Sequence, residues 1–346
     1  MEKKPLKIKD PLFHQISTIP KIDLHAHLNG SIRKSTLISL LPESEREKIE
    51  KLYSSMDFQT AMLFFKISSK IASSLETVRR ITKEMIEDWK SQNVIYLEVR
   101  TSLKSTSNYT KKEYLNAILE EISESNSKNE IITKLILSLD RTKPIDEYNE
   151  IFSIFKSIEK PKLKSIIVGI DYCGNEYKEV HKYHEIIPIF QKFRNENLKI
   201  TLHMGEIPNY QKFPFDKFIP DRISHTHFFT DKDRENYINL SIPIEICPTS
   251  SLLCTHSKSY QDIPFKDIFN HQIKNDKMYN LISINTDDTL LLNTNITNEY
   301  YEVAKNYNLD IAQMKLFVEN SIMMSFEKDE IIKEKLIKKV NQFNMV

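Results

Sequence analysis

Short apolar runs alternate along the chain with longer stretches in which apolar residues recur every three or four positions. The short runs are rich in Ile, Val and Leu and are bounded by polar residues, which is typical of buried strands. The longer stretches have the spacing of an amphipathic helix, for example at Ile67, Ile71, Leu75 and Val78. The first run, within residues 21–30, is predicted to be a strand that ends in two histidines. The later predicted strands are 94–101, 132–140, 165–172, 198–203, 222–228, 242–247 and 281–287.

This alternation of strands and helices predicts an α/β fold with a parallel sheet. Because eight strand-like runs recur, we expect a closed TIM (β/α)8 barrel. A doubly wound open sheet is the alternative, but it normally carries a glycine-rich first turn, and this chain has only four glycines. Without a linker-like segment, residues 1–346 are predicted to form one domain. Residues 29–90, with a turn at Pro42, are predicted to be a helical insert that forms part of an active-site lid.

Composition and charge exclude some classes of partner. Hydrophobic residues make up 40% of the chain and charged residues 28%, and the net charge is +1, so no strong field favours nucleic acid or an anionic membrane. No apolar run is long enough to span a membrane. The three cysteines, Cys173, Cys247 and Cys254, lack metal-finger spacing and are expected to be reduced thiols. We therefore expect a cytoplasmic protein that acts on a small molecule, with a monomer favoured.

Polar residues that could hold a metal gather where the predicted strands end. His25 and His27 lie two residues apart, so their imidazoles share one face of a strand and can bind one ion. In a parallel barrel the chemistry lies at these strand ends. Imidazoles and carboxylates recur there, and they are ligands that divalent first-row metals prefer. The later candidates are Arg100, Asp140, Arg141, Asp171, Gly174, His203, Glu206, His225, His227, Cys247, Asp287 and Asp288.

Four motifs of the chain resemble those of the adenosine/AMP deaminase family, in the family's order and over residues 20–330. They are Leu24-His-Ala-His-Leu-Asn-Gly-Ser31, His203-Met-Gly-Glu206, Arg222-Ile-Ser-His225 and Asn285-Thr-Asp-Asp288. The detail resembles one branch, the adenosine deaminase-like proteins that act as N6-methyl-AMP deaminases. The features of that branch are Asn29, where adenosine deaminases usually carry Asp, together with 96–101 and 206–209.

The resemblance implies a purine deaminase with one zinc ion per chain. A zinc ion lowers the pKa of a bound water to about 7, so that a nucleophile is available at neutral pH. Glu206 would protonate N1 of the purine, His225 would accept the proton of the water, Asp288 would contact N7, and the Gly174 backbone would contact the N3 edge. The implied zinc ligands are His25, His27, His203 and Asp287. The full set of predicted substrate-binding residues is His27, Asn29, Ser69, Lys70, Thr101, Arg141, Gly174 and Asp288.

The side chain at position 29 favours a nucleotide substrate. Asn29 is neutral and can donate a hydrogen bond, whereas a carboxylate there would repel a 5′-phosphate. Ser69, Lys70, Thr101 and Arg141 could supply further donors to that phosphate. We therefore expect conversion of N6-methyl-AMP and water to IMP and methylamine. The alternatives are deamination of adenosine to inosine and ammonia, and an inactive purine-binding protein, although such a protein has usually lost a ligand or the acid.

Four positions depart from the family's pattern without removing a ligand. Ser224 and Thr226 replace the glycines that usually flank the catalytic histidine. Ser251 stands where Asn is frequent, and Thr289 replaces a frequent proline. His227 is predicted to lie on the same strand face as His225 and is a competing candidate for the base, with His225 preferred. No lysine ends the fourth predicted strand, where binuclear relatives carry a bridging one, so one metal is expected.

Overall fold

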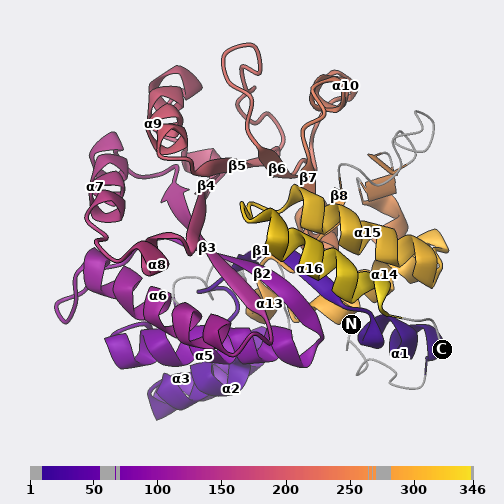
Figure 1. Ribbon diagram of the computed structural model, residues 1–346, viewed down its shortest axis with the longest axis horizontal. Coiled ribbons are helices and arrows are strands. Elements are labelled where there is room, and N and C mark those ends of the chain that lie inside the picture. Colours follow the sequence, from indigo (N-terminus) through magenta and orange to yellow (C-terminus); the bar gives the residue numbers. More distant parts are fainter. Residues whose placement is uncertain are drawn as a thin grey trace.

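The computed structural model describes residues 10–54, 67, 71–263, 265–266, 268–269 and 282–343. Eight parallel strands form a single sheet in sequential order, and helices surround it (Figure 1). The side chains of the strands are almost entirely buried, because one face of the sheet points into the barrel and the other packs against helices. The strands are β1 (Lys21–His27), β2 (Val94–Thr101), β3 (Ile132–Asp140), β4 (Ile167–Cys173), β5 (Lys199–Met204), β6 (Arg222–His225), β7 (Ile244–Ile246) and β8 (Ile282–Ile284).

The sheet curls until its last strand meets its first. An isolated parallel bridge joins Ala26 of β1 to Asp287, just beyond β8. The amide of His27 donates to the carbonyl of Asp287 at 3.0 Å, and the amide of Asp287 donates to the carbonyl of His25 at 2.8 Å. The TIM barrel prediction is therefore confirmed, and the doubly wound alternative is wrong, because its outer strands would not meet. Closure also brings three of the predicted zinc ligands side by side.

Helices alternate with the strands and form the outer layer (Figure 1). The described part of the predicted insert after β1 is helical, with Pro42 between its first two helices, as expected. Those helices are α2 (Lys34–Leu40), α3 (Glu43–Ser54) and α5 (Leu75–Ser91). The others are α1 (Pro11–Thr18), α6 (Lys111–Ser127), α7 (Ile145–Lys156), α8 (Pro161–Lys164), η1 (Glu176–Lys178), α9 (Tyr183–Asn195), α10 (Asp231–Asn239), α11 (Pro248–Cys254), η2 (Tyr260–Asp262), α13 (Thr289–Leu292), α14 (Ile296–Tyr307), α15 (Ile311–Met324) and α16 (Glu330–Asn341).

Strand β6 is shorter than its sequence pattern predicted. It ends at His225, because His225 and Thr226 have φ angles of +66° and +56° in the left-handed region. A β-branched residue such as Thr226 rarely adopts that conformation, whereas glycine adopts it without strain. The expectation of a strand over 222–228 is therefore wrong at its carboxyl end. His227 lies beyond the strand and does not share a strand face with His225.

The barrel interior holds charged side chains where aliphatic residues are usual. Arg100, Glu245, Asp171 and Arg222 are all fully buried. Glu245 lies 2.7 Å from a guanidinium nitrogen of Arg100 and 2.7 Å from one of Arg222, and Asp171 lies 3.4 Å from Arg100. Each buried charge thus has an opposite charge beside it, which offsets the cost of removing it from water. This network lies directly beneath the histidines of the site.

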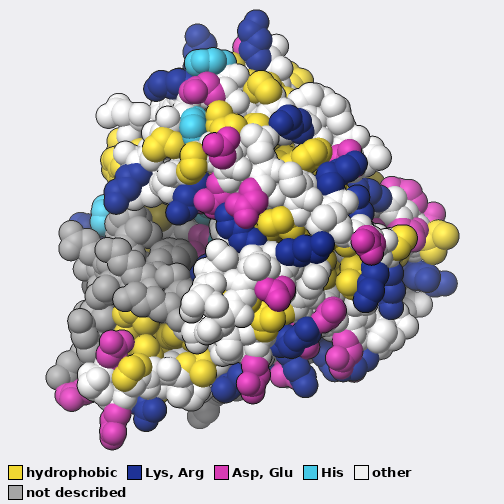
Figure 2. All heavy atoms as spheres, turned by 90° about the vertical axis from the view of Figure 1, so that its left-hand side faces the viewer, with side chains coloured by type: hydrophobic (Ala, Val, Ile, Leu, Met, Phe, Trp, Pro, Cys, Tyr) yellow, Lys and Arg dark blue, Asp and Glu magenta, His cyan; other side chains and the backbone are white. Residues whose placement is uncertain are grey.

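Among the described residues, no helix is long and apolar enough to cross a membrane. On the face drawn in Figure 2, Lys and Arg side chains are interspersed with Asp and Glu. This mixture agrees with the net charge of +1 for the whole chain.

Candidate active site

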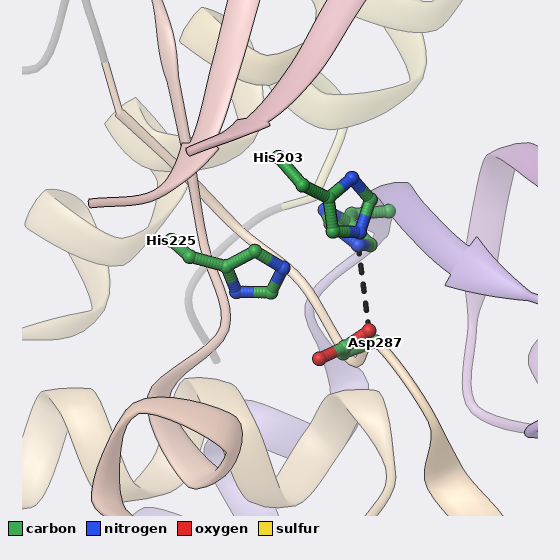
Figure 3. Close-up of side chains that lie close together, drawn as sticks. His203, His225 and Asp287 are labelled. Carbon is green, nitrogen blue, oxygen red and sulfur yellow. Dashed lines mark ion pairs between the residues drawn. The ribbon is translucent and has the colours of Figure 1, made fainter. Parts of the chain in front are cut away.

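The four predicted zinc ligands converge at the carboxyl ends of β1, β5 and β8. The Nε2 atom of His27 lies 3.2 Å from Nε2 of His25 and 3.2 Å from Nε2 of His203. Oδ1 of Asp287 lies 3.4 Å from His25 and 3.5 Å from His27 (Figure 3 shows Asp287 and His203 facing the common space). Ligand atoms held tetrahedrally at about 2.0–2.1 Å from a zinc ion lie about 3.3 Å apart. The observed spacings match that value.

Two buried carboxylates orient these imidazoles. Nδ1 of His25 lies 2.8 Å from Oε2 of Glu245, and Nδ1 of His203 lies 2.8 Å from Oδ1 of Asp171. We assign the proton of each ring to Nδ1, since a carboxylate accepts it. Each Nε2 then presents a lone pair to the centre of the site. Lone pairs at such spacing repel one another unless a cation lies between them, so this buried group can hold a metal ion.

Burial opposes ionisation of these two carboxylates, but the hydrogen-bond donors and guanidinium groups beside them outweigh it. His203 and Arg100 hold the pKa of Asp171 well below its usual value. Arg100 and Arg222 likewise hold the pKa of Glu245 far below its usual range. Both carboxylates are therefore ionised and keep their histidines in one tautomer. In sequence, the signal for Glu245 is a charged residue between Ile244 and Ile246 in a buried run, which our sequence reasoning did not use.

Glu206 occupies the turn after β5 and is poised as an acid. Its side chain is 26% exposed, and its Oε1 lies 3.9 Å from Nε2 of His225. Burial, followed by the negative charge of Glu176, raises the pKa of Glu206 to about 8. A carboxyl group with such a pKa is protonated at neutral pH and can donate its proton to a ligand.

His225 lies beside the metal cluster. Its ring nitrogen is within 4.8 Å of ligand atoms of His25, His203 and Asp287 (Figure 3). Among the described residues neither of its ring nitrogens has a hydrogen-bond partner, and burial lowers its pKa well below the usual value. The ring is therefore neutral, and both of its nitrogens are available to a ligand. His227 is also buried, with its pKa lowered to about 4 by burial. The ring centroids of His225 and His227 lie 5.2 Å apart.

Asp288 lies so close to Gly30 that a side chain at position 30 would collide with it. A Cβ on Gly30 would fall 1.5 Å from Oδ1 of Asp288. Burial, together with the neighbouring carboxyl groups of Asp287 and Glu206, raises the pKa of Asp288 well above its usual value. Oδ1 of Asp288 has no hydrogen-bond partner within the described chain. Asp288 is thus a buried carboxyl group whose protonated form is favoured, and its Oδ1 atom has no partner in the described chain.

Asn29 forms a polar cluster with the end of β2 and with α6. Its Nδ2 lies 3.1 Å from Oγ1 of Thr101 and 3.3 Å from the hydroxyl of Tyr114. Its Oδ1 is buried and has no partner among the described residues. Turning the amide over would let Oδ1 accept from the two hydroxyls and leave an N–H for a ligand.

The remaining predicted substrate residues differ in where they lie. Arg141 is fully buried, its guanidinium lies 3.0 Å from Glu176, and it donates to the carbonyl of His203 at 2.7 Å. These contacts are those of a residue that supports the structure around the site. Gly174 follows directly after β4 and has φ +100°, a conformation that favours glycine. Ser69 and Lys70 lie outside the described residues, so their predicted contacts stay predictions.

Lys104 was not among the predicted site residues. It lies three residues beyond Thr101, on the segment that follows β2, and burial lowers its pKa to about 8. No carboxylate of the described chain lies within ion-pair distance of it. Such a cation suits an anionic ligand. The available sequence signal was a lysine shortly after a strand that already carried predicted site residues.

Comparison with known proteins agrees with this site. The family model of adenosine deaminase matches residues 20–343. An N6-mAMP deaminase of Arabidopsis thaliana is 29% identical over 91% of this chain and 95% of its own. An adenosine deaminase of Clostridium acetobutylicum is 27% identical over 94% of this chain and 98% of its own. The crystal structure of Arabidopsis ADAL complexed with IMP superposes with a TM-score of 0.81 at 29% identity, over 94% of this chain and 97% of that one. The chain therefore belongs to the adenosine deaminase family and is a hydrolytic purine deaminase.

Proposed function

We propose that this enzyme converts N6-methyl-AMP and water to IMP and methylamine. The observation that carries the proposal is Asn29, a neutral amide bonded to Thr101 and Tyr114. A carboxylate at this position would repel a 5′-phosphate, whereas an amide can donate to it. The Arabidopsis relative is named for this activity, and IMP, the ligand of the solved ADAL structure, is the product of the proposed reaction.

One zinc ion per chain is the proposed cofactor, with His25, His27, His203 and Asp287 as its ligands. The spacing of these four side chains and the carboxylates behind two of the histidines support that assignment. When bound, zinc supplies a water that is acidic enough to act as a nucleophile near neutral pH. The remaining chemistry belongs to the side chains of the site.

Three side chains are proposed to handle protons around the purine. Glu206, protonated near neutral pH, donates to N1 and makes C6 more electrophilic. His225, whose ring is neutral and unpartnered in the described chain, accepts the proton of the attacking water. Protonated Asp288 donates to N7, and the Gly174 backbone contacts the N3 edge. Loss of methylamine from C6 then completes the conversion to the hypoxanthine ring.

The phosphate is proposed to lie near the end of β2. Asn29 and Thr101 supply polar groups there, and Lys104 supplies a positive charge that no described carboxylate neutralises. Ser69 and Lys70 of the insert, within 29–90, are proposed to complete this side as part of a lid. Arg141 is assigned instead to the support of the Glu206 turn, because its guanidinium is paired with Glu176 beneath the site.

A substrate panel tests the assignment. Release of methylamine or ammonia should be measured from N6-methyl-AMP, AMP, adenosine and adenine side by side, and zinc should be counted by elemental analysis. We expect the highest kcat/KM for N6-methyl-AMP and one zinc per chain. In Asn29→Asp, phosphate repulsion should raise KM for the nucleotide far more than for the nucleoside. Efficient turnover of adenosine without turnover of N6-methyl-AMP would establish the alternative, an adenosine deaminase.

A further inference from the structure

The turn that carries Glu206 follows β5, but a residue beyond β4 stabilises it. Glu176, in η1 beyond β4, points its carboxylate at three successive backbone amides of this turn. Oε1 accepts from Gly205 N–H at 3.2 Å, and Oε2 accepts from Glu206 N–H at 2.9 Å and Ile207 N–H at 3.2 Å. Burial raises the pKa of Glu176, while the positive charge of Arg141 and these hydrogen bonds favour its ionised form.

Arg141 anchors this carboxylate from below. Its guanidinium lies 3.0 Å from Oε1 of Glu176, and both side chains are almost completely buried. A second guanidinium nitrogen donates to the carbonyl of His203 at 2.7 Å and to that of Tyr172 at 3.3 Å. Arg141 thereby ties the ends of β4 and β5 to the carboxylate. The position of Glu176 is thus determined by two strands and a buried charge rather than by its own short helix.

We propose that Glu176 is a positioning residue for Glu206, setting the place of the catalytic carboxyl group relative to the purine ring. This inference rests on the proposed function, in which Glu206 is the proton donor. Glu206 is the middle residue of the three whose amides Glu176 accepts, so a shift of this carboxylate moves the backbone from which the acid projects.

The charge of Glu176 also supports the role of Glu206 as an acid. Glu176 carries a negative charge close to Glu206, and this charge helps to keep Glu206 protonated. Arg141 balances the charge of Glu176, so the site does not accumulate two unpaired carboxylates. Support of the turn and protonation of the acid therefore come from the same side chain.

The test compares Glu176→Gln with a matched variant, Glu179→Gln. Glu179 lies in the same segment and accepts from the hydroxyl of Tyr172 at 3.1 Å, but within the described chain it makes no contact with the 205–207 turn. Gln at 176 turns an amide N–H toward backbone N–H groups, which displaces the turn. We expect kcat for N6-methyl-AMP to fall by about 10- to 100-fold in Glu176→Gln, because a misplacement of about 1 Å has that effect. KM, zinc content and the affinity for IMP should change less than about threefold. Glu179→Gln should match the wild type.

A double-mutant cycle separates positioning from a general structural role. If Glu176 acts through Glu206, adding Glu176→Gln to Glu206→Gln should lower kcat by less than about threefold. Equal losses in both backgrounds would overturn the inference, as would a single Glu176→Gln variant with wild-type kcat. If Glu206→Gln itself keeps nearly full turnover, both the proposed acid and its positioning residue are wrong.

A second variant, Glu176→Asp, tests the inference even if Glu176→Gln does not fold. Glu176→Asp keeps the charge toward Arg141 and withdraws the carboxylate by one carbon, so kcat should fall between the wild type and Glu176→Gln. If Glu176→Gln does not fold, wild-type kcat in Glu176→Asp overturns the inference, and a reduced kcat with unchanged KM and zinc content supports it.

Discussion

Nδ1 of His203 lies 2.8 Å from Oδ1 of Asp171, a fully buried carboxylate on the neighbouring strand β4. This bond holds the ring so that Nε2 faces the proposed zinc site. The charge of Asp171 is itself balanced by Arg100 at 3.4 Å. A ligand histidine is therefore oriented by a strand that contributes no proposed ligand of its own.

Asp171→Asn should weaken zinc binding by about 10- to 100-fold, as is typical when the partner of a ligating histidine is changed. The metal-free protein should be titrated with zinc in competition with a chelator. Ser138→Ala is the control, since Ser138 donates to the other oxygen of Asp171 at 3.1 Å and its loss leaves the His203 bond in place. Wild-type zinc affinity in Asp171→Asn would contradict the proposed role.

Glu206→Gln should lose several kcal/mol of transition-state stabilisation while it keeps zinc and IMP. The wild type should also lose kcat/KM as pH rises through about 8, because the pKa of Glu206 is raised to about 8 and the donor form exists below it. Initial rates across this pH range measure the effect. The descending limb should be absent from the residual activity of Glu206→Gln, and its persistence there would assign it to another group.

His225→Ala should lose most of its turnover, whereas His227→Ala should lose little. Of these two histidines, it is His225 whose ring nitrogen lies within 4.8 Å of ligand atoms of His25, His203 and Asp287. Its Nε2 also lies 3.9 Å from Oε1 of Glu206. Both variants remove one buried neutral imidazole, so they are matched in what they cost the fold. Turnover and zinc content should be measured together. A larger loss of turnover in His227→Ala would reverse the assignment of the base.

Gly30→Ala should damage purine binding through Asp288. The new Cβ would fall 1.5 Å from Oδ1 of Asp288, which must then move. We expect kcat/KM to fall by about 100-fold, the effect of about 1 Å of misplacement, with zinc content unchanged. Asp288→Asn is the comparison, because its amide keeps a donor for N7 and should cost less. A Gly30→Ala enzyme with wild-type kcat/KM would show that Asp288 does not contact the purine.

Much of the fold could be predicted because its signals are local. The strand that ends in His25 and His27 is visible as a strict alternation of apolar and polar residues, and this alternation places both imidazoles on one face. The alternation of strands and helices along the whole chain predicted the barrel. The end of β6 was missed because it depends on left-handed backbone at His225 and Thr226, which neither residue type indicates.

The sequence by itself determined which residue types stand at the strand ends, and in what order. Only the tertiary structure decided which of them meet. Closure of the barrel between Ala26 and Asp287 brings the first and last ligands together, and it places Glu245 behind His25. Glu176 reaches the Glu206 turn from another strand end. These contacts join residues far apart in the chain, and no local periodicity encodes them. They arise when parallel strands align their carboxyl ends around one axis.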